Sequence, residues 1–226
     1  MQFPSLKNLA ENALVTIRRF PLEVLFALAG TIAGTVIIEL SYLQRVNENW
    51  CLRVMMIANL GFLLSLSATL FTESKNITGA KKLLIKLSAA LVVISLLFLL
   101  NPGEHSSDYI KFFLFSLTFH LLVAYAAFTA PDSIQGFWQF NKTLFLRFLT
   151  GALYSAVLFL GLAAAIGAMN FLFNFKFEWD TFSILFTWIV GMFSTLFFLA
   201  GVPADIQALD SDFSYPKGLK FLHNMY

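Results

Sequence analysis

Six long runs of apolar residues alternate with short polar segments along the chain. A helix needs about 20 apolar residues to cross the hydrocarbon core of a bilayer. Each run reaches that length without interruption, whereas the strands of a membrane barrel are short and alternate apolar with polar residues. The pattern therefore predicts six transmembrane helices, over residues 22–40, 50–71, 83–100, 109–130, 148–173 and 181–202.

Helix-breaking residues mark where several of these runs begin or end. Pro21 opens the first run, a turn signal at residues 101–103 stops the third, and Pro203 stops the sixth. Proline is tolerated in the first turn of a helix but not in its interior, so these positions support the division into six helices. We therefore expect one transmembrane domain over residues 21–203, followed by a tail over residues 204–226.

Two further segments are predicted to lie on the membrane surface. In residues 1–20, apolar side chains recur at helical spacing between charged and amide side chains, which is typical of an amphipathic interfacial helix. The apolar run that follows is too long for a signal peptide, and no small-residue cleavage motif closes it. In residues 131–147, aromatic residues interleave with Gln, Asn and Lys, and aromatic rings favour the headgroup level. The predicted fold class is therefore all-α: a six-span bundle with interfacial helices at the N-terminus and between the fourth and fifth spans.

Composition agrees with a membrane protein. Hydrophobic residues make up 58% of the chain and charged residues only 12%, about half the charge that a soluble domain carries. So little charge argues against a disordered chain and against a nucleic-acid-binding surface. The single cysteine, Cys51, excludes an internal disulfide and a multi-cysteine metal site.

Basic residues are distributed unevenly between the two sides of the predicted bundle. With the N-terminus inside, eleven Lys and Arg residues fall on the inner side and four on the outer side. Segments on the cytoplasmic side of a membrane carry an excess of Lys and Arg. The distribution predicts that both termini lie in the cytoplasm, so residues 204–226 form a cytoplasmic tail.

Small residues recur at spacings of three and four in the predicted spans, which places them on one face of a helix. In lipid, helices associate through close packing of small residues and through polar contacts. We therefore expect helix contacts at the glycines of these stripes: Gly30, Gly34, Gly61, Gly151, Gly161 and Gly191.

Charged residues within the spans are few, and most have a structural explanation. Glu23 lies in the first turn of the first span, where free N–H groups and the helix dipole favour a carboxylate. Glu39 lies at the opposite end of that span, where the dipole disfavours it, and is expected to pair with Arg45 or Arg53. Three basic residues near span ends are expected to extend to water: Arg53, Lys86 and Lys111.

His120 and Asn59 are the uncharged polar residues that we select as candidate intramembrane sites. His120 lies in the middle of the fourth span, on the same face as Ser116 and Ala124. Its imidazole has two open interpretations: a hydrogen bond to a neighbouring group, or a role in proton relay or in lining a substrate cavity. Asn59 lies about two turns into the second span and is expected to bond to another helix.

No motif in the chain specifies a reaction. The sequence lacks phosphate-binding, zinc-binding and nucleophile motifs, so no catalytic residue, cofactor or metal ligand is predicted. Two hypotheses follow: a transporter-like or permease-like bundle, or a non-catalytic membrane subunit that docks partner helices or proteins. An enzyme acting on lipid ranks last, because no polar cluster is evident at the interface. The expected partners are the lipid bilayer and either a second copy of the chain or another membrane subunit.

The order of the hydrophobic features resembles a bacterial membrane family of unknown function, domain-of-unknown-function family 4153. Four stretches carry the resemblance: FPL at 20–22, NLGFLLSLSATLFTE at 59–73, RFLTGALYSAVLFLGLAAAIGAMNFLF at 147–173, and FFLAGVP at 197–203. The resemblance implies a multi-pass protein of the bacterial inner membrane and brings no activity. Family members continue past a YPKGLK-like segment, here at 215–220, into further spans. The chain is therefore expected to be the N-terminal part of a longer architecture or a shortened member.

Overall fold

The computed structural model describes residues 6–40, 48–129, 134–173, 175 and 177–206, and within these ranges every regular element is helical. The elements are α1 (Leu6–Arg19), α2 (Pro21–Leu40), α3 (Glu48–Ser74), α4 (Gly79–Leu99), α5 (Ser107–Ala126), α6 (Ile134–Phe173), α7 (Trp179–Trp188), the π-helix η1 (Ile189–Ser194) and α8 (Thr195–Ala200). α7, η1 and α8 follow one another without a break and count as one span. In the described part of the chain, six helices are thus long and apolar enough to cross a membrane, the same number as the predicted spans.

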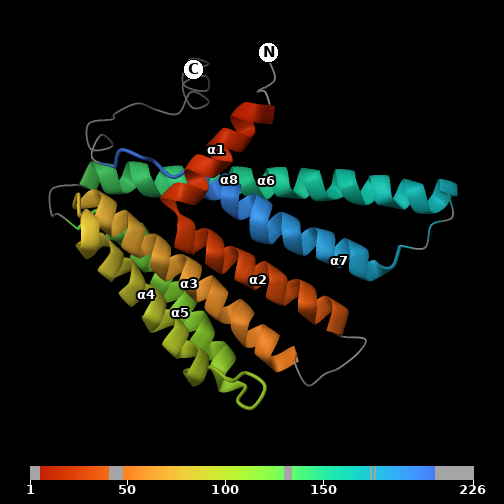
Figure 1. The fold of residues 1–226 in the computed structure, drawn as a ribbon, viewed down its shortest axis with the longest axis horizontal. Helices are drawn as coiled ribbons and strands as arrows, with labels where there is room; N and C mark the ends of the chain where they lie inside the picture. The colour runs from red at the N-terminus through yellow and green to blue at the C-terminus, as the bar shows by residue number, and fades with distance from the viewer. Residues whose placement is uncertain (1–5, 41–47, 130–133, 174, 176, 207–226) are drawn as a thin grey trace, which may run out of the picture.

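The helices form two groups that meet along α2 and where the end of α5 contacts the start of α6. α3 packs against α2, α4 and α5, while α6 packs against η1 and α8. α2 contacts both α3 and the α7–η1 segment, and Figure 1 shows α7 running between α2 and α6. α2 and α3 are therefore the centre of the bundle, and α6 lies at its margin.

Glycines allow α2 to approach its neighbours closely. A Cβ atom at Gly30 would lie 3.0 Å from the Cβ of Ala58 on α3, and one at Gly61 would lie 2.5 Å from the ring of Phe26 on α2. On the other side of α2, a Cβ atom at Gly191 would clash with Thr31. The small-residue stripes of the first, second and sixth spans are therefore helix contacts, as predicted.

The stripe on the fifth span is only partly a contact. A Cβ atom at Gly151 would lie 3.3 Å from the ring of Phe197, so this glycine meets the sixth span. In contrast, nothing among the described residues lies within 4 Å of a Cβ atom at Gly161. The predicted contact at Gly161 is wrong within the described part of the chain. Phe159, two residues earlier, still packs against Phe186 of α7 with ring centroids 5.4 Å apart, so Gly161 lies on a face of α6 that is turned away from α7.

α6 also differs from its predicted division into a surface segment and a span. Residues 134–173 form one helix of 40 residues, about 60 Å long at 1.5 Å per residue. Residues 134–147 therefore do not form a separate helix, whereas their position at the membrane surface stays a prediction. Residues 131–133 are not among the described residues. No proline interrupts residues 134–173, so nothing in the local sequence ends the helix where the polar residues give way to apolar ones.

The predicted N-terminal helix is present as α1, over Leu6–Arg19. Thr16 is buried, whereas Leu14, Val15 and Ile17 are exposed. Its position on the membrane surface stays a prediction. The tail that follows the sixth span is described only to residue 206.

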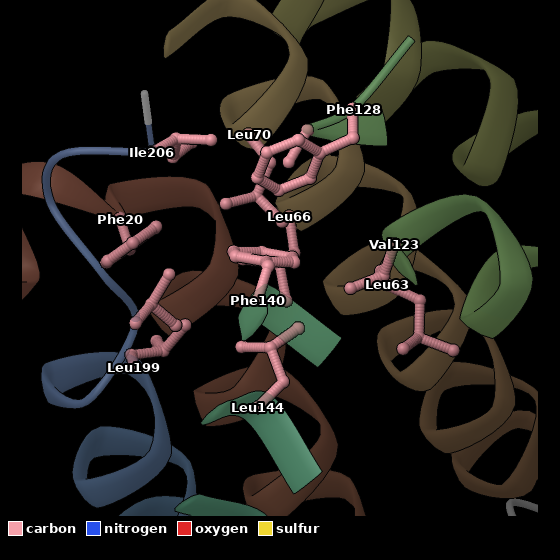
Figure 2. Packing of buried hydrophobic residues seen from close by; sticks show 12 residues of the cluster. Phe20, Leu63, Leu66, Leu70, Val123, Phe128, Phe140, Leu144, Leu199 and Ile206 are labelled. Carbon is pink, nitrogen blue, oxygen red and sulfur yellow. The ribbon is translucent and has the colours of Figure 1, made fainter. Parts of the chain in front are cut away.

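An apolar cluster fills the end of the bundle where α1, the start of α6 and the segment after α8 meet. Figure 2 shows its side chains converging from α3, α5, α6 and the C-terminal segment. The ring of Phe140 is fully buried, and its centroid lies 5.6 Å from that of Phe128. We call this set the apolar cluster: Phe20, Leu63, Leu66, Leu70, Val123, Ala127, Phe128, Phe140, Leu144, Leu199, Val202 and Ile206.

Candidate functional site

A cavity of about 770 Å³ lies between the two groups of helices. Its walls come from α2, α3 and α5 on one side, and from α6, α7, η1 and α8 on the other. Most of the lining is aliphatic or aromatic. Among the residues that the structure describes, no Asp, Glu, Lys or Arg lines it. The polar side chains of the lining are Thr31, Asn59, His120, Asn141, Thr187, Ser194 and Thr195.

His120 is held in the wall of this cavity by its own helix. Its ring Nδ1 lies 2.7 Å from the carbonyl oxygen of Ser116, one turn earlier on α5. Because a carbonyl oxygen can only accept, Nδ1 must carry the hydrogen of this bond. In the neutral imidazole, Nε2 is then the hydrogen-bond acceptor. His120 therefore offers one acceptor whose tautomer is fixed by the backbone.

Asn59 is connected to the same serine. The hydroxyl of Ser116 donates to Oδ1 of Asn59 at 3.3 Å, which joins α5 to α3. This bond confirms the expectation that Asn59 bonds to another helix. It assigns the carboxamide oxygen to Ser116, so the NH₂ group of Asn59 is the remaining donor. Ser116 thus fixes both candidate residues, one through its hydroxyl and one through its carbonyl.

Asn141 comes from α6, on the opposite wall of the cavity. Its amide nitrogen donates to the carbonyl oxygens of Ala124, at 3.2 Å, and Phe137, at 2.9 Å. The first bond joins α6 to α5 one turn beyond His120. Sequence reasoning placed Asn141 in a surface segment and missed this role. Its position among aromatic residues at the start of a long apolar helix gave no sign of the neighbouring helix.

The π-helix η1 forms part of the wall formed by the sixth span. Val190, Gly191 and Ser194 of η1 line the cavity. A π-turn inserts a residue into an α-helix and so shifts the side chains that follow, and such turns are frequent at functional sites. At Gly191 the absence of a side chain lets η1 meet Thr31 of α2. The sequence predicted Gly191 as a contact but not the π-helix.

The apolar cluster bounds one end of the cavity. Leu63, Leu66, Val123 and Leu144 belong both to the cluster and to the cavity lining. The remaining members of the cluster lie nearer the end of the bundle where α1 and the sixth span both end. That end of the cavity is therefore closed by packed side chains.

Glu23 does not line the cavity, although it is fully buried. Its Oε1 accepts a hydrogen bond of 2.5 Å from the hydroxyl of Thr69 on α3. Its Oε2 has no hydrogen-bond partner among the described residues. The place of Glu23 in the first turn of α2 is as the sequence predicted, and the bond to Thr69 was not foreseen.

Arg53 and Glu39 are also apart from the cavity. The guanidinium of Arg53 donates to the carbonyl of Leu97 on α4 and lies 4.4 Å from the ring centroid of Trp50. Glu39 is exposed at the end of α2, and within the described residues it has no ion pair with Arg53. The Glu39–Arg53 pairing is therefore wrong, because the guanidinium is occupied by the end of α4. Arg45 lies outside the described residues.

Of the two lysines expected to reach water, only one does so. Lys111 is exposed and its Nζ lies 2.6 Å from Oδ1 of Asp108, one turn earlier on α5. Lys86 is only 7% exposed, so its predicted extension to water is wrong. Its helix packs against α3, and this packing covers the lysine stem that the sequence placed near a free helix end.

Arg19 connects separate segments of the chain through contacts that the sequence did not predict. Its guanidinium bonds to both carboxylate oxygens of Glu73, at 2.8 and 3.3 Å. It also donates to the carbonyl oxygens of Val202, at 2.8 Å, and Pro203, at 2.7 Å. One side chain therefore joins the end of α1 to the end of α3 and satisfies carbonyls just beyond α8. The only signal was that Arg19 and Glu73 fall on the same predicted side of the membrane.

Comparisons with known protein families, with curated proteins and with solved structures found no match to this chain. The resemblance to domain-of-unknown-function family 4153 therefore stays a prediction. The six apolar helices support a multi-pass membrane protein. Within the described residues, no group of three or more His, Cys, Asp or Glu side chains could hold a metal ion.

Proposed function

We propose that this chain is a transporter-like membrane protein that binds a small molecule in the cavity beside His120 and Asn59. The observation that carries the proposal is that two polar residues from different spans, selected from the sequence, line one cavity. Pockets of 300–1,000 Å³ with a mostly apolar lining and a few placed polar groups are typical of small-molecule sites. A polar residue within a membrane bundle is by default a candidate for a substrate path.

The closed end of the cavity supports transport rather than static packing. Alternating access requires that a central site be open to one side while packed residues close the other. In this proposal the packed side chains of the apolar cluster close one side. Arg19 holds the end of α1 at the same end of the bundle through its bonds to Glu73 and to the carbonyl of Val202. We further propose that this end faces the cytoplasm and that the protein belongs to family 4153 and resides in the bacterial inner membrane. The distribution of Lys and Arg and the sequence resemblance support this part of the proposal.

A second candidate function is a membrane subunit that docks a partner helix. The second half of α6 favours it, because nothing in the described part of the chain lies within 4 Å of a Cβ atom at Gly161 or Gly167 and several apolar side chains there are exposed, Phe171 at 88%. Lipid alone is a sufficient neighbour for such a surface, so the cavity carries the main proposal.

Thiol labelling tests whether the cavity is accessible. In a Cys51→Ser background, Ala124→Cys places a thiol in the cavity, and Leu121→Cys places one on an exposed face of the same helix. A thiol reacts with a maleimide as the thiolate, which requires water. We expect a small maleimide to modify Ala124→Cys at least ten times faster than Leu121→Cys in reconstituted protein. Equal, slow modification of both variants would contradict a solvated cavity.

A further inference from the structure

We infer that the cavity takes an uncharged molecule with a hydrocarbon body and a hydroxyl group that bonds to His120 and Asn59. This inference rests on the proposed function and adds the chemical class of the ligand. It is based on the charges, the hydrogen-bonding atoms and the apolar surface of the lining.

Within the described residues, the lining has no permanently charged side chain that could pair with a charged ligand. No Asp, Glu, Lys or Arg of the described chain lines the cavity, and His120 is the one titratable side chain in that lining. Moving an unpaired charge from water into an apolar site is strongly unfavourable. Glu23, Arg53, Lys86 and the Arg19–Glu73 pair all lie outside the lining. An ammonium group would therefore have no counter-charge, and a carboxylate or phosphate would have one only if the His120 imidazole took up a second proton.

Two polar atoms with complementary roles lie on one wall. Nε2 of neutral His120 accepts, while the NH₂ group of Asn59 donates. Both orientations are set by Ser116, which receives the His120 bond at its carbonyl and donates its hydroxyl to Asn59. A hydroxyl group is at once donor and acceptor, so one alcohol can satisfy both atoms. A hydrocarbon leaves both unbonded.

The rest of the cavity is suited to an apolar body. Six phenylalanines line it, and they come from both groups of helices: Phe26, Phe62, Phe145, Phe148, Phe186 and Phe198. Aromatic rings supply large contact areas without requiring a polar partner. Together with the volume of about 770 Å³, this lining fits a long-chain or multi-ring alcohol of lipid size.

Photoaffinity probes of one chain length test this class. The probes are diazirine derivatives of hexadecanol, hexadecane, hexadecanesulfonate and hexadecyltrimethylammonium, applied to the full chain in nanodiscs. We expect the alcohol to label cavity residues with about tenfold higher apparent affinity than the alkane, since one or two hydrogen bonds correspond to roughly that factor. The two charged probes should label the cavity no better than the alkane.

Variants assign the effect to the two polar residues. His120→Leu and Asn59→Leu should each reduce alcohol labelling several-fold towards the alkane level and leave alkane labelling unchanged. Thr118→Val is the matched control, because the Thr118 hydroxyl bonds within α5 to Leu114 and does not line the cavity. This variant should label as the wild type does.

The outcomes separate the two proposals. Equal labelling of the cavity by alcohol and alkane, or stronger labelling by a charged probe, would overturn the ligand class while the binding site stands. Absence of cavity labelling by every probe would overturn both. A soluble alcohol and a membrane lipid share this chemistry, and competition by unlabelled octanol or by diacylglycerol distinguishes the two sources.

Discussion

Replacing Phe140 by alanine is expected to lower the free energy of unfolding by about 3 kcal/mol, the usual cost of truncating a buried phenylalanine. Phe140 is fully buried in the apolar cluster, and its ring lies against that of Phe128 at an interplanar angle of 58°. It joins the start of α6 to the ends of α3 and α8, so its loss leaves a void at the closed end of the cavity. Because the ring contacts other side chains rather than lipid, lipid does not readily fill that void. Denaturation in mixed micelles, followed by helix content, measures the change.

Phe171→Ala is the matched control for this experiment. Phe171 lies on the same helix and is 88% exposed, so its truncation removes few protein contacts. We expect its effect to stay within about 0.5 kcal/mol, as for substitutions away from packed sites. A loss at Phe140 no greater than that at Phe171 would show that the apolar cluster does not hold α6 to the bundle.

Gly61→Ala is expected to destabilise the bundle by about 2 kcal/mol, in the range of overpacked cores. The added Cβ atom would lie 2.5 Å from Cδ1 and Cε1 of Phe26 and 2.7 Å from its Cγ, so the ring or α2 must move. α2 and α3 form the most extensive helix contact of the structure, so the shift should reach the cavity wall that Phe26 lines. Unfolding in mixed micelles measures the loss of stability.

Gly161→Ala is the matched change in the same kind of span. Nothing described lies within 4 Å of its Cβ atom, and alanine favours a helix over glycine by about 1 kcal/mol. The two substitutions should therefore have opposite signs, with Gly161→Ala neutral or stabilising. A stabilising Gly61→Ala would contradict the close contact between α2 and α3. A strongly destabilising Gly161→Ala would show that the second half of α6 is packed against a partner.

The sequence predicts those parts of the fold that depend on local composition. A run of about 20 apolar residues commits a segment to a membrane helix because the backbone must bond within itself in lipid. That reasoning predicted the six helices that, in the described part of the chain, are long and apolar enough to span a membrane, and it predicted the N-terminal helix. It failed at α6, where a change from polar to apolar side chains suggested two elements. Polarity changes the surroundings of a helix but does not end it.

The sequence predicted which residues would make helix contacts, but not which residues they would contact. Gly61 and Gly191 were recognised as contact residues, but their partners, Phe26 and Thr31, could not be named. Single-sequence patterns give the face of a helix and not its neighbour. The same gap produced the errors at Arg53 and Lys86, whose surroundings depend on where α4 lies.

The candidate site was found in part. His120 and Asn59 were selected because polar groups within a membrane span are energetically costly and are therefore candidates for function. Both line the cavity. Asn141 was missed because it lies in the segment assigned to the surface. The π-helix was missed because it adds one residue to a turn without a distinct sequence signal.

An experimental density map of the full chain in lipid nanodiscs tests the central claim most directly. The map should resolve the side chains of α5, α6 and η1. We predict an open cavity between the two groups of helices, with non-protein density reaching the imidazole of His120 and the apolar cluster closing one end. A map in which α6 and η1 pack against α3 and α5, with His120 enclosed by side chains and no space beside it, would contradict the proposed function.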